Sequence, residues 1–338
     1  GEKELNGTIS QADSGARALM LPRAEEALAA ARAAGFDAAA LLPAEKLAYY
    51  PNAEAVRQRV EGDPRALLPQ AKSVLVMVSH FTWFSAWTEG CAEVSAFYFQ
   101  SNQTYRAMKA AAEALLAQGA LVDDSQRVPA KLWAARAGFG AQGRNTLLCS
   151  SDWGTCITLQ TLVTDIEPEN GAARPVPTLD EACGACRRCV EACPAGALDG
   201  RGNLEPEKCL RAWQFSGRAT PEPLREKNGT RLLGCEICQR VCPKNARLPQ
   251  IAPPCEPFRL ETLLRFDKAV RAQLGAAIGA NEARPGRVLA QAALAAGNSG
   301  NRAYLPALKA LRAHENPIVA GHARWAAERL REKSNIWA

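Results

Sequence analysis

The sequence of 338 residues predicts a mixed α/β domain, followed by a cysteine-rich module and a helical C-terminal region. Three observations lead to this prediction. An apolar, β-branched run at 73–79 is typical of a buried strand and lies among segments that favour helices. Eight cysteines gather between residues 183 and 242. After residue 284, short amphipathic segments follow one another with glycine and proline at the turns.

The α/β domain is expected at residues 20–170, because helix-forming and strand-forming segments are mixed there. A helix over 105–117 is predicted to stop before Gly119, and a strand is predicted over 145–149. The remaining helices are expected at 24–34 and 129–137, and the remaining strands at 73–79, 120–123 and 155–164.

The rest of the chain divides at proline-rich stretches. Residues 1–19 are polar and are expected to be poorly ordered and tag-like. The cysteine-rich domain is expected at 171–256 and the helical domain at 257–338. In the helical domain, helices are predicted at 287–296, closed by Gly297, at 305–313 and at 318–330. Short amphipathic helices with proline at the turns are similar to HEAT repeats, which stack into curved binding surfaces.

Eight cysteines form two runs whose spacing is typical of proteins that bind two [4Fe–4S] clusters. The first run reads C-x2-C-x2-C-x3-C-P and ends at Pro194, and the second ends as C-x2-C-x3-C-P at Pro243. The short spacing lets one loop present sulfurs to three irons, while the cysteine before proline binds the other cluster. Cys209 stands in for the missing first cysteine of the second run.

The spacing assigns four cysteines to each cluster. The first set is Cys183, Cys186, Cys189 and Cys242, and the second set is Cys193, Cys209, Cys235 and Cys238. Disulfides would need an oxidising compartment, and zinc sites use paired C-x2-C knuckles without the following proline. Two clusters in series indicate electron transfer. The scattered cysteines, which are predicted to be small buried side chains, are Cys91, Cys149, Cys156 and Cys255.

The net charge of +6 is concentrated at the C-terminus. Residues 284–338 carry nine Lys or Arg and three Glu, and nine minus three equals the whole excess. A basic C-terminal module indicates an anionic partner such as a nucleic acid, whereas a solvated helical surface is the simpler alternative.

Four segments, taken in order, resemble the epoxyqueuosine reductase family of cobalamin-dependent iron–sulfur enzymes. They are AARAGFGAQGRNTLL at 134–148, CGACRRCVEACPAGAL at 183–198, GCEICQRVCPKN at 234–245 and GNSG…LPAL…GHARWA at 297–326. The resemblance covers roughly residues 25–335. It implies an α/β (α+β) corrinoid-binding domain, a bacterial-type two-cluster ferredoxin module and a HEAT-like α-helical tail.

The resemblance also implies the reaction. The family removes an epoxide oxygen from a modified guanosine in the tRNA anticodon and leaves an alkene. The clusters pass electrons one at a time to cobalamin, and an acid protonates the departing oxygen. Alignment of the segment DDSQRVPAKLWAARAG places that acid at Asp124, with Asp123 as the near alternative. An aspartate at this place can equally cap a helix or a turn.

Cofactor contacts follow from the same resemblance. The turn that contains Arg144, Asn145 and Thr146 is expected against the corrin. Leu210 and Ile237 flank cysteines of the second set and are expected at the corrin edge. No D-x-H-x-x-G motif surrounds any of the three histidines, which are His80, His314 and His322. Cobalamin is therefore expected to bind without a protein histidine as its lower ligand.

Three departures from the family pattern lie near the expected substrate site. Thr104-Tyr105-Arg106 replaces a D-Y-H segment, and Ala130 replaces a Glu before Lys131. The turn G-W-I-G-K-N-T is Gly140–Thr146 here, with Arg144 at the lysine position. These departures leave two alternatives open: a corrinoid reductase with another substrate, akin to reductive dehalogenases, and a non-enzymatic electron carrier.

The expected partners are a tRNA anticodon stem-loop and a low-potential electron donor. The longest apolar stretch, near 74–78, is too short to span a bilayer, so no membrane partner is expected. Cluster cysteines without an export signal indicate the cytoplasm. Gly1 in place of Met is typical of an expression tag. A monomer is expected.

Overall fold

The computed structural model describes residues 22–47, 60–169 and 173–332, so the segment 1–19, predicted to be poorly ordered, lies outside the described residues. The chain forms two compact units. The first holds the described residues up to 79, together with 104–139 and 159–176, and the second holds 80–103, 140–158 and 177 onward. Because the chain passes repeatedly from one unit to the other, the predicted boundaries at 170 and 256 stay predictions.

The first unit is built around a four-stranded sheet. Its order is β1 (Ala38–Pro43), β2 (Ser73–His80), β8 (Ile157–Thr164) and β5 (Val122–Asp123). β1 is antiparallel to β2, and β5 is antiparallel to β8. From Ser73 to Ser79 every residue of β2 is buried, as the apolar run at 73–79 predicts for a central strand covered on both faces.

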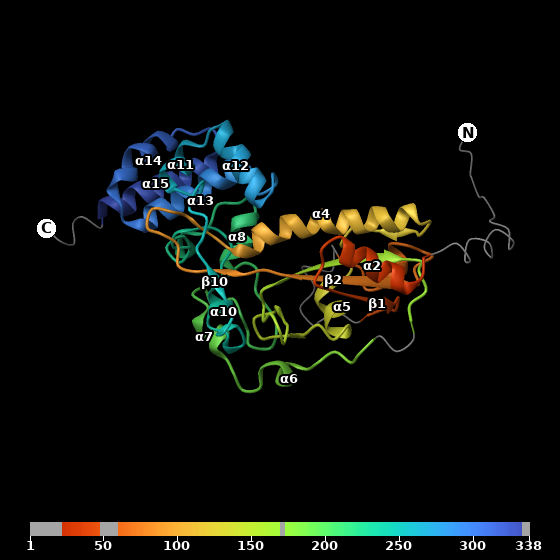
Figure 1. Cartoon of the computed structure of the whole chain (residues 1–338). Helices are drawn as coiled ribbons and strands as arrows, with labels where there is room; N and C mark the ends of the chain where they lie inside the picture. The colour runs from red at the N-terminus through yellow and green to blue at the C-terminus, as the bar shows by residue number, and fades with distance from the viewer. Residues whose placement is uncertain (1–21, 48–59, 170–172, 333–338) are drawn as a thin grey trace, which may run out of the picture. The chain divides into compact units, whose positions relative to one another are not determined.

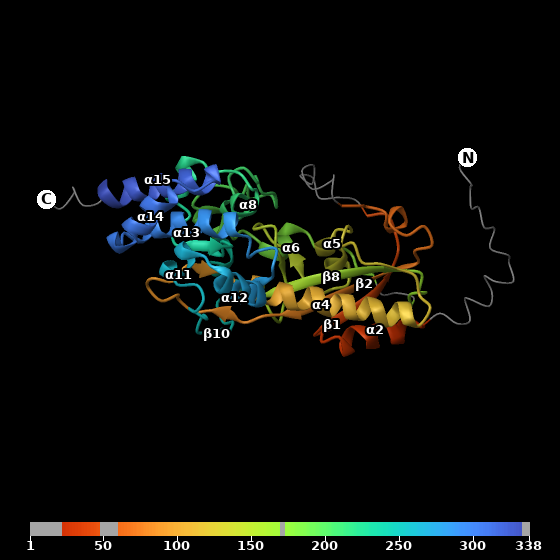
Figure 2. The same ribbon diagram turned by 90° about the horizontal axis from the view of Figure 1, so that it is seen from above.

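Helices bury the two faces of this sheet. α2 (Ala24–Ala33) presents Ala27 and Ala31 to Leu75 and Met77 of β2, and the 104–117 part of α4 (Ala96–Ala117) adds Met108 to the same core. α5 (Ala130–Arg136) lies on the other side of the strands (Figures 1 and 2). The predicted helices are confirmed, except that α4 begins at Ala96 rather than Tyr105, because no glycine or proline interrupts residues 96–104.

Short strand pairs connect distant parts of the second unit. β3 (Trp83–Phe84) lies parallel to β10 (Gln250–Ile251), and β4 (Glu93–Val94) lies parallel to β9 (Arg231–Leu233). β6 (Ala141–Gln142) and β7 (Leu148–Cys149) form an antiparallel hairpin. The strand predicted over 145–149 is therefore wrong at its start, since residues 143–147 form the turn, with Gly143 N–H donating to the Leu147 carbonyl.

The cysteine region carries short helices between its loops. They are α6 (Leu179–Cys183), α7 (Arg188–Ala192), α8 (Leu210–Phe215), α9 (Glu222–Arg225) and α10 (Ile237–Arg240), followed by a 3₁₀ turn at Pro243–Asn245. Such short helices gain little from their own backbone hydrogen bonds, so contacts with the rest of the unit must hold them.

The C-terminal helices are α11 (Leu260–Arg265), α12 (Lys268–Ile278), α13 (Pro285–Ser299), α14 (Leu305–Leu311) and α15 (Pro317–Glu332). They share one hydrophobic core with Val94 of β4 and Leu232 of β9, so within the second unit they pack on the same core as the cysteine region. Among the described residues, no helix has the length and apolarity that crossing a bilayer requires.

The predicted end of the first tail helix at Gly297 is wrong. Gly297 lies inside α13, and the helix ends instead at Gly300, which adopts a left-handed backbone with φ of 76°. The reason is a close helix crossing: a Cβ at Gly297 would lie 2.7 Å from the Cα of Ala326 in α15. Glycine is thus required there for packing rather than for capping.

His322 of α15 connects three segments of the second unit. It is fully buried, and its Nε2 accepts a hydrogen bond from the Thr220 backbone N–H at 3.0 Å. Its Nδ1 lies 3.0 Å from the Ala290 carbonyl of α13, so Nδ1 must carry the proton and donate it there. Burial lowers the pKa of His322 to about 4. The expected role of His322 as a packed helix residue is confirmed.

We predict that acid destabilises the protein through His322. Because the folded-state pKa is about 4 and the unfolded value is about 6.5, the unfolded chain binds more protons between these values. The free energy of unfolding contributed by this group should therefore be full above pH 6.5 and fall as pH is lowered, by roughly 2 kcal/mol at pH 5. Urea unfolding of wild type and His322→Gln at pH 7 and pH 5 measures the difference.

The variant should show a smaller loss of stability between the two pH values than wild type. His314→Gln is the control, because His314 is only half-buried and accepts a single hydrogen bond from the Asn316 backbone. An equal pH dependence in wild type and His322→Gln would contradict the assignment.

Candidate iron–sulfur centre and candidate active site

The candidate acid, Asp124, lies in the first unit directly after β5. Its carboxylate forms an ion pair with the Lys109 ammonium of α4, and the two side chains are 35% and 40% exposed. The hydrogen bond from Lys109 to Asp124 raises the pKa of the lysine. Asp124 is thus held in place by a neighbouring proton donor and still reaches solvent.

Tyr105 completes a group of three with Lys109 and Asp124. It lies one turn before Lys109 on α4, and the lysine ammonium is 5.6 Å from the centroid of its ring. Tyr105 is 48% exposed, which is high for an aromatic side chain. The structure therefore brings the departing segment 104–106 to the candidate acid, through a lysine that sequence reasoning did not single out.

The alternative acid, Asp123, has local partners. Its Oδ1 accepts hydrogen bonds from the Ser125 hydroxyl at 2.7 Å and from the Ser125 backbone N–H at 3.2 Å. Gln126 then holds the loop on β8, accepting from the Thr161 backbone N–H at 3.0 Å. Asp123 thus caps a turn, whereas Asp124 forms an ion pair with a lysine.

The second unit gathers the eight motif cysteines. The thiols that raise the pKa of Cys189, after burial itself, are those of Cys183, Cys242 and Cys186. The thiols that raise the pKa of Cys238, after burial itself, include those of Cys235, Cys209 and Cys193. Each of these two neighbourhoods contains one of the sets expected from the spacing, although Cys238 also lies near Cys189.

The chemistry of these neighbourhoods suits iron–sulfur clusters. Burial raises the pKa of Cys235 and of Cys238, because the charged thiolate is disfavoured where it loses its hydration. Iron supplies compensating positive charge and displaces the thiol protons. In the described part of the chain, no three His, Cys, Asp or Glu converge as ligands of one ion, and all twelve cysteines are free of disulfides.

Cys149 is a functional candidate that the sequence did not indicate. It was expected to be a small buried side chain, and it is buried, but its thiol also hydrogen-bonds the Cys242 sulfur. This bond is the largest cause that lowers the pKa of Cys242, to about 6. The cysteine spacing could not indicate this contact, because Cys149 lies on β7, 93 residues before Cys242.

The turn that was expected to contact a corrin is fixed on the first cysteine loop. Arg144 donates to the carbonyls of Gly184 and Gly200, each at 2.7 Å. Asn145 is buried and accepts from the Leu147 backbone N–H at 3.2 Å. Thr146 has a left-handed backbone with φ of 67°, which is strained for a β-branched residue and often marks a functional site.

The two other expected corrin contacts differ in exposure. Leu210 is 3% exposed and packs with Trp213 and Leu224, so little of its side chain is accessible. Ile237 begins α10 and is half-buried. Ile237 therefore keeps surface that a ligand can touch, while Leu210 lies mainly in a small core.

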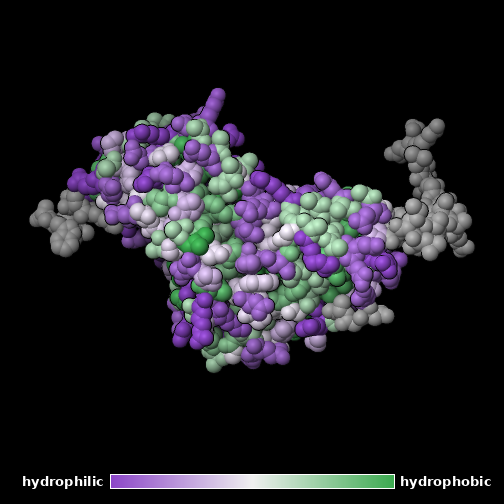
Figure 3. All heavy atoms as spheres, in the orientation of Figure 1, coloured by the Kyte–Doolittle hydropathy of each residue, from purple (hydrophilic) through white to green (hydrophobic). Residues whose placement is uncertain are grey.

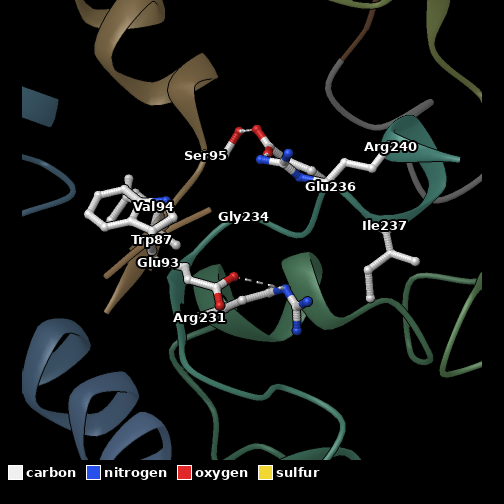
Figure 4. A pocket seen from close by; sticks show the side chains of 10 residues that line it. Trp87, Glu93, Val94, Ser95, Arg231, Gly234, Glu236, Ile237 and Arg240 are labelled. Atoms are coloured by element: carbon white, nitrogen blue, oxygen red, sulfur yellow. Dashed lines mark hydrogen bonds and ion pairs between the residues drawn. The ribbon is translucent and has the colours of Figure 1, made fainter. Parts of the chain in front are cut away.

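Ile237 lines a small cavity of about 40 Å³, which has room for a few water molecules and not for a macrocycle. Figure 4 shows two pairs of charged side chains around it. Glu93 faces Arg231 at 3.9 Å, and Glu236 receives bonds from Ser95 at 2.6 Å and from Arg240 at 2.8 Å. Burial raises the pKa of Glu236, and these bonds counteract the shift.

Asn245, two residues after Pro243 of the second C-P, anchors the cysteine region to the loop that precedes β8. Its Oδ1 accepts from the Thr155 backbone N–H at 2.9 Å, and its Nδ2 donates to the Thr155 hydroxyl and the Gln239 carbonyl at 2.8 Å. Gly154 must be glycine here, because its φ is 53° and a Cβ would lie 2.0 Å from the Asn245 Oδ1. The site loops are therefore fixed by contacts far apart in sequence.

Comparison with known proteins agrees with this arrangement. Residues 182–245 match the family described as a 4Fe-4S double cluster binding domain. The epoxyqueuosine reductase of Lactococcus garvieae is 34% identical over 232 residues, covering 66% of this chain and 62% of the relative. That of Bacillus subtilis is 29% identical over 202 residues, covering 57% and 51%. The aligned chain thus spans between half and two thirds of these relatives.

Solved structures show the same fold. Epoxyqueuosine reductase from Streptococcus thermophilus aligns with a TM-score of 0.75 and 22% identity, over 91% of this chain and 90% of that one. An epoxyqueuosine reductase solved with a tRNA-Tyr stem loop modified with epoxyqueuosine aligns with a TM-score of 0.73 and 21% identity, over 90% and 89%.

The fold and the cysteine region define an iron–sulfur protein with a double-cluster domain. Among such proteins, the chain is similar to the epoxyqueuosine reductases, in sequence over about two thirds of its length and in fold over about nine tenths. The resemblance that the four sequence segments predict is therefore confirmed.

We predict eight iron atoms and eight sulfides per chain in anaerobically purified protein. Cys209→Ala should lower both towards four, because Cys209 belongs to the second set only. Cys255→Ala is the matched control, since Cys255 lies outside both sets and should leave the content at about eight. Iron and sulfide analysis with EPR of the reduced protein measures this. Bound zinc, or equal loss in both variants, would contradict the assignment.

Proposed function

We propose that this chain is a cobalamin-dependent iron–sulfur reductase that converts epoxyqueuosine to queuosine in a tRNA anticodon. The observation that carries the proposal is the similarity to epoxyqueuosine reductases in sequence and in fold. The overall change is the removal of one oxygen: an epoxide, two electrons and two protons give an alkene and water. A reducing compartment such as the cytoplasm suits the thiolate ligands that this chemistry needs.

The electrons require a relay, which the two cysteine sets provide. We assign one [4Fe–4S] cluster to the set containing Cys183 and Cys242, and the other to the set containing Cys193 and Cys209. Clusters of this kind carry one electron each, so two must be delivered in succession for each epoxide. Arg144 and Asn245 stabilise the loops that hold the cysteines, through the hydrogen bonds described above.

Cobalamin is proposed to bind through the α/β domain at 20–170 and the turn at 144–146. Bound there, it would supply a strongly reducing and nucleophilic metal centre. Thr146 and Ile237 keep exposed surface for it, while the side chains of Leu210 and Asn145 would contribute less. Cobalamin is proposed to bind without a protein histidine ligand: His322 is buried with both ring nitrogens bonded, and the Nδ1 of His314 accepts a hydrogen bond from the Asn316 backbone N–H.

Asp124 is proposed to deliver a proton to the departing oxygen. A carboxyl group that donates a proton must regain one before the next turnover. Asp124 is 35% exposed, so it can regain the proton from solvent, while the hydrogen bond from the Lys109 ammonium keeps the carboxyl group pointing in one direction. Lys109 is thus proposed as a positioning residue, with Asp124 as the acid.

We predict that Asp124→Asn lowers turnover of tRNA containing epoxyqueuosine by roughly 10²-fold or more, the scale of general acid catalysis. Lys109→Met should lower it less and shift the pH profile, because the acid remains but loses the positive charge that positions it. Asp123→Asn is the matched control and should keep activity, since Asp123 bonds only its own turn. Anaerobic single-turnover assays with a strong chemical reductant measure all three.

Unchanged cluster and cobalamin spectra would show that the variants keep their cofactors. Full activity in Asp124→Asn, or a larger loss in Asp123→Asn, would reject the assignment of the acid to Asp124.

A corrinoid reductase with a different substrate is the second candidate. One observation favours it: Tyr105, in the segment that departs from the family pattern, lies beside Lys109 at the candidate acid. A different side chain beside the acid changes which substrates can reach Asp124. Turnover of epoxyqueuosine tRNA by the wild-type protein decides between the two candidates.

The C-terminal helices are proposed to bind the tRNA. α13, α14 and α15 pack as successive helices, in keeping with the HEAT-like pattern, and hydrophilic side chains cover this part of the surface in Figure 3. Arg302 and Arg324 are exposed, whereas Arg329 is held by Glu226. The target base must leave its stack for its epoxide to be reached, as enzymes that modify bases require.

We predict that Arg302→Glu with Arg324→Glu weakens tRNA binding. The slope of log affinity against log salt should become shallower by about one unit for each arginine, because binding releases fewer counterions when a phosphate contact is lost. Arg32→Glu with Lys46→Glu is the matched control: it makes the same change of charge at two exposed residues of the first unit. Anaerobic gel shifts at several salt concentrations measure both. No salt-dependent binding by wild type would refute the tRNA proposal.

A further inference from the structure

An open depression lies beside Cys242 in the second unit. Its volume is about 610 Å³, and residues of α7 and of the segment that follows α10 line it. We call this surface the Cys242 face, formed by Arg188, Glu191, Ala192, Val241, Cys242 and Pro243, with Lys244 at its edge. Figure 3 shows hydrophilic and hydrophobic side chains side by side in this part of the molecule.

The Cys242 face combines basic and apolar side chains. Arg188 and Lys244 are exposed, and Glu191 is the single acid among the lining residues. Arg240 also lines the depression, but its guanidinium is engaged by Glu236 and by the Phe84 carbonyl. The apolar lining residues include Ala192, Val241 and Pro243. A small surface that mixes charged and apolar side chains is typical of weak, transient protein interfaces.

The depression exposes one of the cluster cysteines. Cys242 is half-buried and lines it directly, so the cluster that contains Cys242 would lie next to this surface. Electron transfer becomes much slower as the distance between donor and acceptor grows, so a donor must dock where a cluster approaches the surface. The second set includes Cys235 and Cys238, which lie before and after Ile237 along the chain, and Ile237 is expected at the corrin edge.

We propose that the Cys242 face is the docking surface of an acidic, low-potential protein that donates single electrons. The inference rests on the proposed function, because it requires the two clusters. One electron leaves the reduced flavin or iron–sulfur group of the donor and reduces the cluster held by Cys242. The donor is oxidised by one electron, the cluster gains one, and no bond forms or breaks. Two such encounters supply one epoxide reduction.

A protein suits this surface better than a nucleic acid. The residues that line the depression include no aromatic side chain on which a base could stack. Its basic residues lie among apolar side chains, which contacts to phosphates do not require. Acidic side chains on the donor would pair with Arg188 and Lys244 and accelerate the encounter at low salt.

Anaerobic stopped-flow reduction tests the proposal. An acidic flavodoxin, reduced to its hydroquinone, is mixed with the oxidised holoprotein, and cluster bleaching is followed. The rate constant of wild type should fall steeply with salt, and Arg188→Glu with Lys244→Glu should lower it by at least about tenfold at low salt, as charge reversal does in steered association. Arg188→Ala with Lys244→Ala should give a smaller loss in the same direction.

Two controls separate docking from damage. Photoreduced 5-deazaflavin, a small reductant, should reduce wild type and variants equally, and Arg32→Glu with Lys46→Glu should keep the flavodoxin rate. Three results would overturn the proposal. The flavodoxin rates could be equal in wild type and in Arg188→Glu with Lys244→Glu, or the wild-type rate could be independent of salt. The double variant could also lose tRNA binding while its flavodoxin rate stays unchanged. No tRNA enters the reduction assay, so a failure of the proposed substrate leaves its result unaffected.

Discussion

The close gathering of eight thiols in one unit is the constraint on which the rest of the second unit depends. Thiolates in a buried group repel one another and lose hydration, and burial raises the pKa of Cys189, Cys235 and Cys238 accordingly. Short helices cannot hold such a group by themselves. The loops are fixed instead by Arg144 and by Asn245, through hydrogen bonds to segments far away in sequence.

Sequence reasoning predicted those parts of the fold whose signals are local. The buried strand at 73–79 and the helix at 24–34 are confirmed, because periodicity and a following glycine decide them. The predicted helix end at Gly297 is wrong for a non-local reason: the glycine permits α13 to cross α15, and the sequence of α13 by itself does not indicate that crossing. The strand predicted over 145–149 is wrong at its start, since the apolar neighbours of the turn over 143–147 do not indicate a hairpin.

The candidate sites follow the same rule. The cysteine sets could be predicted because each lies in motifs of a few residues, whereas Cys149 reaches Cys242 only through folding. Lys109 was missed for that reason too: it lies 15 residues before Asp124, and only the packing of α4 beside β5 brings the two together. A sequence motif therefore identifies the ligands of a centre more readily than the residues that tune or hold it.

Arg144 shows how a departure from the family pattern can be structural. The family resemblance expects lysine there, and a lysine ammonium is a compact point charge on a flexible chain. The planar guanidinium of Arg144 instead donates from two nitrogens to the carbonyls of Gly184 and Gly200, both of the first cysteine region. Arginine thus joins the hairpin of β6 and β7 to Gly184, next to Cys183, and to Gly200, in the segment that follows Cys193. The departure at Tyr105 differs in kind, because that side chain is exposed beside the candidate acid and can meet a substrate.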